Sequence, residues 1–201
     1  MACSALNWQP DGMIAVRRIG LGDMRSVVGA IDRTEHVDGE YAVVDGRLVD
    51  RPVTMSDIPP FDPVGDGSHS VTAKVRFCES VMQDHGGVGF GAFHGERVAG
   101  VAIVAPSFEP SLAWFAVLHV NRADRRTGVA SALWDATVET AQERNARQMY
   151  VSATPTASAV GFYLSRGCRL AAPVHPALFA LEPDDIHLIT ELGSPAGGIM
   201  E

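Results

Sequence analysis

A short basic segment in the second half of the chain has the residue types of an anion site. Residues 125–130 read Arg-Arg-Thr-Gly-Val-Ala, after an apolar run at 112–120 and before a helical pattern that starts at Ser131. A helix start leaves about four backbone N–H groups without partners, and its positive dipole end attracts phosphate. Gly128 would let the backbone approach a phosphate closely. No Lys-Ser/Thr pair follows this glycine, so the segment is not a Walker loop.

A second segment makes the first one more specific. On its own the basic string is weak, because short motifs recur by chance and an ordinary helix start with two exposed arginines would explain it. About thirty residues further on, residues 156–168 read Thr-Ala-Ser-Ala-Val-Gly-Phe-Tyr-Leu-Ser-Arg-Gly-Cys. Together the segments resemble the GNAT superfamily of acetyltransferases, which carries Gln/Arg-x-x-Gly-x-Gly/Ala and then Asn-x-x-Ala-x-x-Phe-Tyr-x-x-x-Gly-Phe. The positions that match the second pattern are Ala159, Phe162, Tyr163 and Gly167. Thr156 and Cys168 depart from it.

The resemblance implies acetyl-CoA as the co-substrate and indicates which residues would hold it. Main-chain groups at the end of the apolar strand would meet the acetyl and pantetheine parts, and backbone N–H groups of the basic loop would hold the pyrophosphate. The residues at these places are Leu118, His119, Val120, Arg125, Arg126, Thr127, Gly128, Val129, Ala130 and Ser131. Phe162 would pack on pantetheine, with Ala159 in the same segment. Thr156 stands where an asparagine often contacts the coenzyme arm, and its side chain is shorter.

Tyr163 is the candidate general acid, in the role that the resemblance gives to this tyrosine. A phenol has an ordinary pKa near 10, so it is protonated at pH 7 and can donate to the thiolate of coenzyme A as it leaves. An isolated tyrosine would be explained as a packed ring with its hydroxyl in water. The surrounding motif favours the acid.

The general base that must accept the amine proton is not evident on the central strand. Family members place a glutamate or histidine at positions that match Trp114 and Ala116, and neither side chain can take a proton. His119 lies on the same strand, but strand side chains alternate, so it is expected on the opposite face unless a bulge intervenes. We therefore interpret His119 as a structural residue that satisfies a hydrogen bond.

Three sources of the base stay open: a water chain, a weakly basic amine, or a carboxylate of the irregular region at 35–70. The carboxylates considered are Glu35, Asp38, Glu40 and Asp57. The candidate acceptor contacts are Trp114, Glu35 and Tyr41. Trp114 would either meet a cationic acceptor through a cation–π contact or pack in the core.

The elements that must position these residues follow a mixed order of strands and helices. Runs of β-branched and aromatic residues predict strands, and apolar residues three or four apart predict helices. The expected strands are 14–18, 88–94, 98–106, 112–120, 148–153, 168–172 and 185–192, and the expected helices are 23–33, 71–83, 131–147 and 157–165. This order predicts an α/β fold with helices packed on a sheet. The resemblance adds a mixed central sheet of the GNAT type with splayed central strands.

Residues 35–70 interrupt this pattern with prolines and glycines, so we expect an irregular insertion that is either a binding loop or a mobile one. Residues 41–49 within it predict a hairpin, because Asp-Gly supplies the positive φ angles of a type I′ turn. The insertion would wall off one end of the acceptor cleft. We expect one domain over residues 1–192, followed by a flexible tail at 193–201.

Composition narrows the range of partners. The net charge of −8 argues against nucleic acid or an anionic membrane surface as the main partner. Cys3, Cys78 and Cys168 lack metal-ligand spacing and are expected to be reduced thiols of a cytoplasmic protein. The seven histidines are scattered, so no metal site is expected. No run of about 18 apolar residues predicts a membrane helix.

These observations predict an N-acetyltransferase that moves an acetyl group from acetyl-CoA to a primary amine by direct attack. A small-molecule amine is the first expectation, and a protein N-terminus or lysine side chain is the second. A module that binds acyl-CoA without turnover is the alternative, which the lack of a strand base favours and Tyr163 disfavours. Homodimers are common in the family, so a homodimer is one expected assembly.

Overall fold

The computed structural model describes residues 13–193. Its strands are β1 (Ala15–Ile19), β2 (Glu35–His36), β3 (Glu40–Val44), β4 (Arg47–Arg51), β5 (Asp57–Ile58), β6 (Val88–His94), β7 (Arg97–Glu109), β8 (Leu112–Val120), β9 (Gln148–Ala153), β10 (Arg169–Leu170) and β11 (Ile186–Glu191). Its helices are α1 (Met24–Gly29), α2 (Val71–Asp84), α3 (Val129–Glu143), α4 (Ala157–Ser165) and α5 (Pro176–Leu181), with 3-10 turns at Leu21–Asp23 and Arg122–Asp124. Cys3 and the expected tail beyond Gly193 lie outside the described residues.

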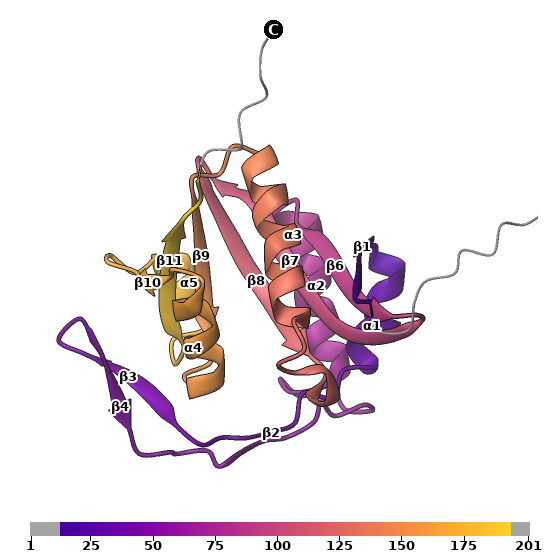
Figure 1. Cartoon of the computed structure of the whole chain (residues 1–201), viewed down its shortest axis with the longest axis horizontal. Helices are drawn as coiled ribbons and strands as arrows, with labels where there is room; N and C mark the ends of the chain where they lie inside the picture. The colour runs from indigo at the N-terminus through magenta and orange to yellow at the C-terminus, as the bar shows by residue number, and fades with distance from the viewer. Residues whose placement is uncertain (1–12, 194–201) are drawn as a thin grey trace, which may run out of the picture.

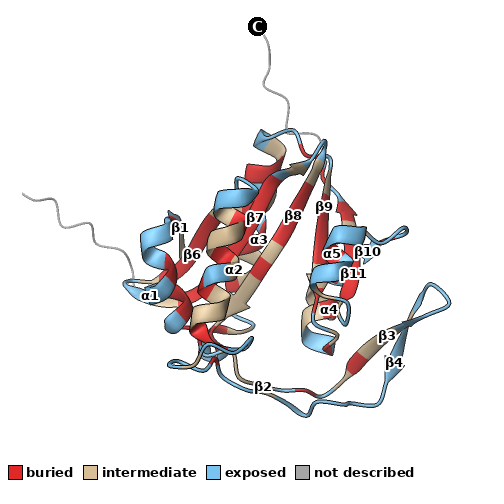
Figure 2. Cartoon of the chain, turned by 180° about the vertical axis from the view of Figure 1, so that it is seen from behind, coloured by how far each residue is buried: buried red, intermediate tan, exposed pale blue. Residues whose placement is uncertain are grey.

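A seven-stranded sheet with the order β1-β6-β7-β8-β9-β11-β10 forms the centre of the fold (Figure 1). Its neighbouring strands are antiparallel except β8 and β9, which run parallel. Helices α3 and α4 cover one face, and α1, α2 and α5 cover the other (Figures 1 and 2). The expected α/β fold, a mixed sheet flanked by helices, is confirmed.

Strands β8 and β9 separate part-way along their length, as the resemblance implied. They pair from Leu112 with Gln148 to Phe115 with Val151, and their described residues pair no further. The second half of β8 keeps β7 as a partner and presents unpaired main-chain groups toward β9. Figure 1 shows the two strands diverging toward their C-terminal ends, where the chain enters α3 and α4.

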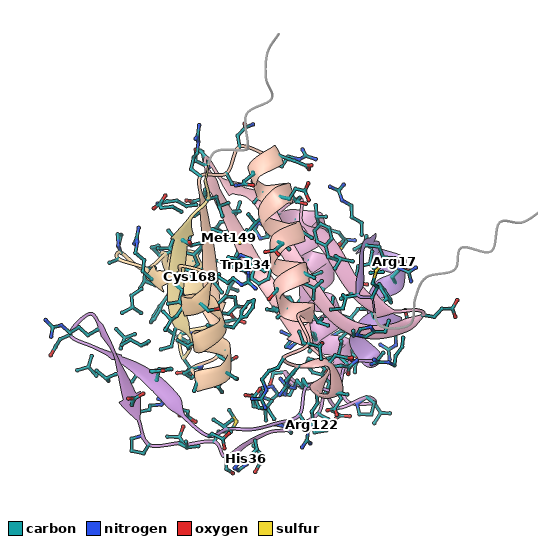
Figure 3. The ribbon with its side chains drawn as sticks, viewed as in Figure 1. Arg17, His36, Arg122, Trp134, Met149 and Cys168 are labelled. Carbon is teal, nitrogen blue, oxygen red and sulfur yellow. The ribbon has the colours of Figure 1, made fainter. Side chains whose placement is uncertain are left out.

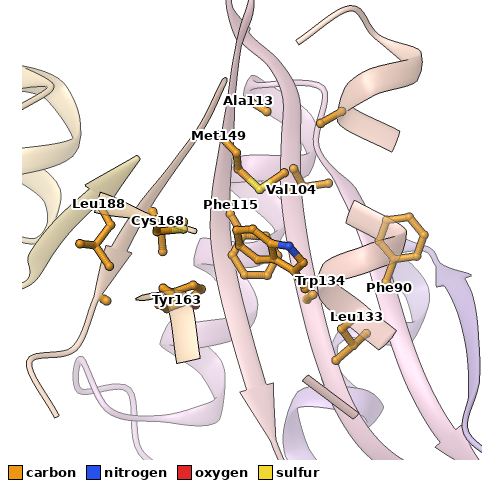
Figure 4. Packing of buried hydrophobic residues seen from close by; sticks show 14 of the residues in the cluster. Phe90, Val104, Ala113, Phe115, Leu133, Trp134, Met149, Tyr163, Cys168 and Leu188 are labelled. Atoms are coloured by element: carbon orange, nitrogen blue, oxygen red, sulfur yellow. The ribbon is translucent and has the colours of Figure 1, made fainter. Parts of the chain in front are cut away.

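Each face of the sheet has its own core. Under α3 and α4, the rings of Phe115, Trp134 and Tyr163 pack against one another (Figure 4). On the other face, Met24 and Trp114 are buried between the sheet and its helices. Burying a large apolar side chain stabilises a fold by roughly 1.5–3 kcal/mol. The two cores therefore hold β8 and β9, the strands that separate, in fixed positions.

Helix α1 is shorter than the sequence predicts. The expected helix covers 23–33, whereas α1 ends at Gly29. The chain turns away from the helix after Gly29, because the backbone N–H of Asp32 donates a hydrogen bond to Asn121 Oδ1, just after β8, at 2.6 Å. A long-range hydrogen bond thus overrides the local helical pattern.

Two other helices differ from expectation for local reasons. Helix α3 begins at Val129, ahead of the expected start, because Gly128 precedes it with a φ of +97° that favours glycine. Helix α5 was not expected at all. It is too short to show a clear period, and His175 caps it by accepting a hydrogen bond at Nδ1 from Leu178 N at 3.3 Å.

We call residues 32–59 the strap, because this segment crosses the open end of the splayed sheet (Figures 1 and 2). Beside β8, Arg122 N donates to Asp32 O at 2.8 Å. Beside the start of α4, Ala157 N donates to Gly39 O at 2.8 Å. The expected hairpin is confirmed as β3 and β4, and β2 pairs with β5 in a short ribbon that was not predicted.

A buried carboxylate holds the strap in shape. Glu40 is 4% exposed, and its Oε1 accepts hydrogen bonds from Thr54 N and Met55 N, both at 3.0 Å. Its Oε2 accepts from Arg51 Nε and from Thr54 Oγ1, both at 2.8 Å. These hydrogen bonds, above all the one from the Met55 backbone, lower the pKa of Glu40 to about 2. Glu40 is therefore ionised and already saturated with hydrogen bonds from the protein.

Replacing Glu40 with glutamine is expected to lower the melting temperature, because an amide cannot accept all of these hydrogen bonds. The wild type should show a matching pH dependence. A carboxyl with a pKa of 4.5 when unfolded and about 2 when folded contributes its stability above pH 4.5 and loses it as the pH falls toward 2. Thermal melts between about pH 6 and pH 2 measure this, with Asp50→Asn as an exposed control on the same hairpin. A Glu40→Gln variant that melts like the wild type at every pH would contradict it.

Candidate active site

A cavity of about 560 Å³ lies at the opening between β8 and β9, next to the strap. Its lining includes the following predicted coenzyme and acid residues: Leu118, His119, Val120, Arg125, Arg126, Gly128, Ala130, Ser131, Thr156, Ala159, Phe162 and Tyr163. Thr127 and Val129 do not line it. Thr127 Oγ1 donates to Asp124 O at 2.6 Å, and Val129 is buried in the core.

The loop before α3, residues 121–128, is held in place by an ion pair. Asp124 is 4% exposed and accepts two hydrogen bonds from Arg97, at 2.6 and 2.8 Å. These hydrogen bonds lower the pKa of the Asp124 carboxyl. Arg126 and Gly128 adopt φ angles of +62° and +97°, in the region that side chains rarely occupy. The result is a fixed turn at a helix start, the arrangement whose backbone N–H groups bind phosphate.

The two arginines of this loop have different surroundings. Arg125 Nη1 lies 3.0 Å from Glu35 Oε2, and Arg125 Nη2 donates to the Arg33 carbonyl at 2.8 Å. Glu35 also accepts a hydrogen bond from Ser158, so it joins the loop to α4 across the opening. Arg126 is exposed, lines the cavity and forms no ion pair within residues 13–193. Arg125 therefore fastens the strap, and Arg126 is the cation available to a phosphate.

Tyr163 is held on three sides by other rings. Its ring lies beside those of Phe115 and Trp134 (Figure 4), at centroid distances of 6.1 and 5.9 Å. The centroid of Phe162 lies 5.2 Å away. The side chain is 6% exposed, and its hydroxyl has no hydrogen-bond partner among the described residues. Burial raises the pKa of Tyr163 well above its ordinary value of 10. The phenol is thus a rigid, protonated donor at the cavity wall.

Thr156 does more for α4 than for the cavity. Its Oγ1 accepts a hydrogen bond from Ala159 N at 3.3 Å and lies 3.1 Å from Ser158 Oγ. This is the capping position that satisfies a free N–H of the first helical turn. The Thr156 hydroxyl is therefore engaged within the protein, although the residue also lines the cavity.

The sequence matches the family model for the acetyltransferase (GNAT) family over residues 54–168. This chain belongs to the GNAT acetyltransferase family. The match includes the basic loop before α3 and the α4 segment, the two segments on which the resemblance was based. The chain is therefore an acetyl-CoA-dependent N-acetyltransferase.

Solved GNAT structures share the fold with this chain at low sequence identity. Nourseothricin acetyltransferase is 21% identical with a TM-score of 0.64, over 90% of this chain and 99% of the other. A Bacillus anthracis protein assigned as a streptothricin acetyltransferase, solved with acetyl coenzyme A, is 14% identical with a TM-score of 0.60, over 92% and 99%. The ribosomal-protein-S18-alanine N-acetyltransferase of Escherichia coli is 13% identical with a TM-score of 0.57, over 94% and 99%. No curated protein matches the sequence.

A β-bulge in β8 changes which side chains of this GNAT protein face the acceptor side. Val117 pairs with Ile103 and Phe115 pairs with Val104, so Ala116 is an extra residue in the strand. Trp114 and Val117 consequently pack on the same face, under α1 and α2. His119 follows on that face, and the prediction that it lies opposite Trp114 is wrong because the bulge shifts the alternation by one residue.

His119 has the surroundings of a proton acceptor. It lines the cavity, and its ring meets the edge of Phe61 at a centroid distance of 5.2 Å. Its ring nitrogens form no hydrogen bond with any residue between 13 and 193, so the interpretation as a hydrogen-bonded structural residue is not supported. Burial, together with the positive charges of Lys74, Arg33 and Arg125, lowers the pKa of His119 well below 6.5. The imidazole is therefore neutral at pH 7 and has a free lone pair.

The four carboxylates considered as bases are not placed for that role. Asp38 and Asp57 are exposed, and their carboxylates lie 3.7 and 3.1 Å from the ring of His36. His36 itself lies at the edge of the molecule in Figure 3. Glu40 is saturated by hydrogen bonds, as described above. Glu35 lines the cavity, but both of its oxygens are engaged by the basic loop and α4.

Two of the three candidate acceptor contacts also lie elsewhere. Trp114 is 3% exposed and packs against Phe77 and Phe108 at centroid distances of 6.0 and 5.3 Å, so it is a core residue. Tyr41 packs against the core from β3 and does not line the cavity. Only Glu35 of the three reaches the cavity wall. Core packing was one of the two alternatives for Trp114, and the structure decides for it. The place of Tyr41 was not predicted, because it depends on packing between distant segments.

The described residues offer little other chemistry. Within residues 13–193, no group of three or more His, Cys, Asp or Glu side chains is arranged to hold a metal ion. None of the described helices is long and apolar enough to cross a membrane. Cys78 and Cys168 are free and buried, and burial raises their pKa values to about 11 and about 12. Thiols with such high pKa values are poor nucleophiles at pH 7.

Proposed function

We propose that this GNAT enzyme acetylates a primary amine of a small molecule by direct attack on acetyl-CoA, without an acyl-enzyme. The observation that carries the proposal is the cavity at the opening of the sheet. It joins the basic loop and Tyr163, on the face covered by α3 and α4, to His119, on the face covered by α1 and α2. Two substrates can therefore approach one point from opposite faces.

The residues present fit the coenzyme. Arg126 and the N–H groups at the start of α3 suit the pyrophosphate, because a charged fork and a helix N-terminus both favour anions. The main-chain groups of β8 at residues 117–120 that face away from β7 have no strand partner among the described residues and can hydrogen-bond the pantetheine arm, and Phe162 can pack against it. Acetyl-CoA supplies an activated thioester to this site.

In the proposed mechanism, His119 and Tyr163 handle the two protons of the reaction. The amine nitrogen bonds to the thioester carbon, and the carbon–sulfur bond then breaks. His119 accepts the proton that the nitrogen loses, and Tyr163 donates to the sulfur, which leaves as a thiol. Solvent returns the proton from the imidazolium to the tyrosine, so the products are the amide and coenzyme A. The free main-chain groups of β8 can stabilise the thioester oxygen during attack.

The strap favours a small acceptor. It crosses the opening from the end of β8 to the start of α4, which leaves less space for an extended polypeptide. Met55, Ile58 and Pro59 from the strap line the cavity. The relative with the TM-score of 0.64 is also named for a small molecule, nourseothricin.

Titration of the purified protein with acetyl-CoA by calorimetry tests the proposal. We expect micromolar binding that Arg126→Glu weakens by about tenfold to a hundredfold or more, because a charge-assisted hydrogen bond is replaced by repulsion. Arg122→Glu is the matched control: it makes the same charge change nearby, at an exposed residue outside the cavity lining. Free-thiol release with a panel of amines then identifies acceptors. Absence of acetyl-CoA binding in the wild type would refute the proposal.

A further inference from the structure

We propose that the acceptor end of the cavity contains an anion site built on Arg33, and that the enzyme selects amines that also carry a carboxylate. This inference rests on the proposed function, because it concerns the acceptor of the same reaction. The local charge around His119 is positive, because Lys74, Arg33 and Arg125 lie near it.

Arg33 is fixed in place but its charge is not neutralised. Its guanidinium carbon lies 4.4 Å from the centroid of the Phe61 ring, and its Nε donates to the Pro59 carbonyl at 2.9 Å. The residue lines the cavity and is partly buried. No carboxylate of residues 13–193 lies within ion-pair distance of it, and its terminal nitrogens make no hydrogen bond there.

A cation in this position is costly without an anion. Removing a charge from water is unfavourable unless an opposite charge or hydrogen bonds compensate for it. Burial lowers the pKa of Arg33, which reflects this cost. A guanidinium held over a ring, with free terminal nitrogens, can bind a carboxylate by two parallel hydrogen bonds. A carboxylate from a ligand would therefore be stabilised here.

The anion site lies next to the proposed point of reaction. Phe61 contacts both groups, Arg33 at 4.4 Å and His119 at 5.2 Å, so an amine at His119 places its other substituents near Arg33. Lys74 adds a second positive charge close to His119 and forms no ion pair within the described residues. Glu35 contributes little negative charge because Arg125 neutralises it.

The same positive field helps the amine to react. A nearby cation disfavours a protonated amine, so it increases the fraction of the nucleophilic free base. It also disfavours a polycationic acceptor, which would bring several charges toward Arg33 and Lys74. A carboxylate on the acceptor that pairs with Arg33 offsets this repulsion, and Lys74 remains as a positive charge near His119.

The test compares pairs of amines that differ only by a carboxylate: L-phenylalanine with phenethylamine, L-lysine with cadaverine, and β-alanine with ethylamine. We expect kcat/KM, measured by free-thiol release, to favour one or more of the carboxylated members by about tenfold or more, the value of one charge-assisted interaction. Arg33→Gln should abolish this preference and Arg33→Lys should keep part of it. Arg122→Gln, which removes a charge beside the strap but outside the cavity lining, should leave it unchanged.

Several outcomes would overturn the inference. One is equal kcat/KM for both members of every pair, and another is an equal loss for both in Arg33→Gln. Weaker acetyl-CoA binding by Arg33→Gln in calorimetry would assign Arg33 to the coenzyme phosphates instead. If no pair reacts, the complex of the enzyme with coenzyme A is titrated with the same amines by calorimetry. Amine binding without a preference for the carboxylated members would refute the anion site. A wild type that binds no acetyl-CoA refutes the proposed function itself, so the two failures are distinguishable.

Discussion

Replacing Tyr163 with phenylalanine is expected to lower kcat about a hundredfold or more while leaving the Kd for acetyl-CoA nearly unchanged, since general acid catalysis contributes about 10²–10⁴-fold. The ring is locked between Phe115, Trp134 and Phe162, so phenylalanine should keep the packing and remove only the hydroxyl. The raised pKa of Tyr163 keeps that hydroxyl protonated over the whole working range. Steady-state free-thiol release gives kcat, and calorimetry gives the Kd.

Tyr150→Phe is the matched control for this change. Tyr150 is also buried, but its hydroxyl accepts a hydrogen bond from His175 N at 3.1 Å and lies outside the cavity lining. We expect it to lose some stability and to keep its kcat. If Tyr163→Phe retains full activity, the thiolate must be protonated by another donor and Tyr163 is a packing residue.

Replacing His119 with glutamine is expected to lower kcat by about a hundredfold and to change the acidic side of the pH profile, because proton acceptance requires the neutral imidazole. The pKa of His119 lies below 6.5, so protonation of His119 should add a further decline to the wild-type rate only at pH values below 6.5. The variant lacks this ionisation, and its acidic limb should reflect the amine alone. Rates measured from about pH 4.5 to pH 9 give both profiles.

Chemical rescue separates a catalytic His119 from a structural one. Added imidazole should restore part of the rate of His119→Ala, since the substitution removes the ring and leaves space in the cavity wall. His36→Gln, on the exposed edge of the strap, serves as the control and should behave like the wild type. If His119→Gln has an unchanged kcat and pH profile, His119 is not the base. The proton acceptor would then be a water chain or bulk solvent.

Several elements were predictable from the sequence with their exact bounds. The strands at 88–94 and 112–120 and the helix at 157–165 form with the bounds that their apolar runs and flanking turns indicate. The bulge at Ala116 was not predictable, because one extra residue leaves the apolar pattern almost unchanged but reverses the face of every later side chain. The role of His119 depends on that single residue.

The parts of the candidate site that come from continuous segments were predictable, and the parts that depend on contacts between distant segments were not. The basic loop and α4 are continuous in sequence, and the residues expected to hold the coenzyme nearly all line the cavity. The different roles of Arg125 and Arg126 were not predictable, because the residue that pairs with Arg125 is Glu35 in the strap. Arg33 was missed for the same reason: its neighbours Phe61 and His119 are distant in the chain.

The contacts of Glu35 have a consequence for how substrates are received. The Glu35 carboxylate is bound by Arg125 on the β8 side of the opening and by Ser158 on the α4 side. These two contacts hold the sides of the opening at a set distance. The opening is therefore shaped when the chain folds, before any substrate arrives. A site that is already formed loses little conformational entropy on binding. Binding of the coenzyme is therefore expected to require little movement of the strap.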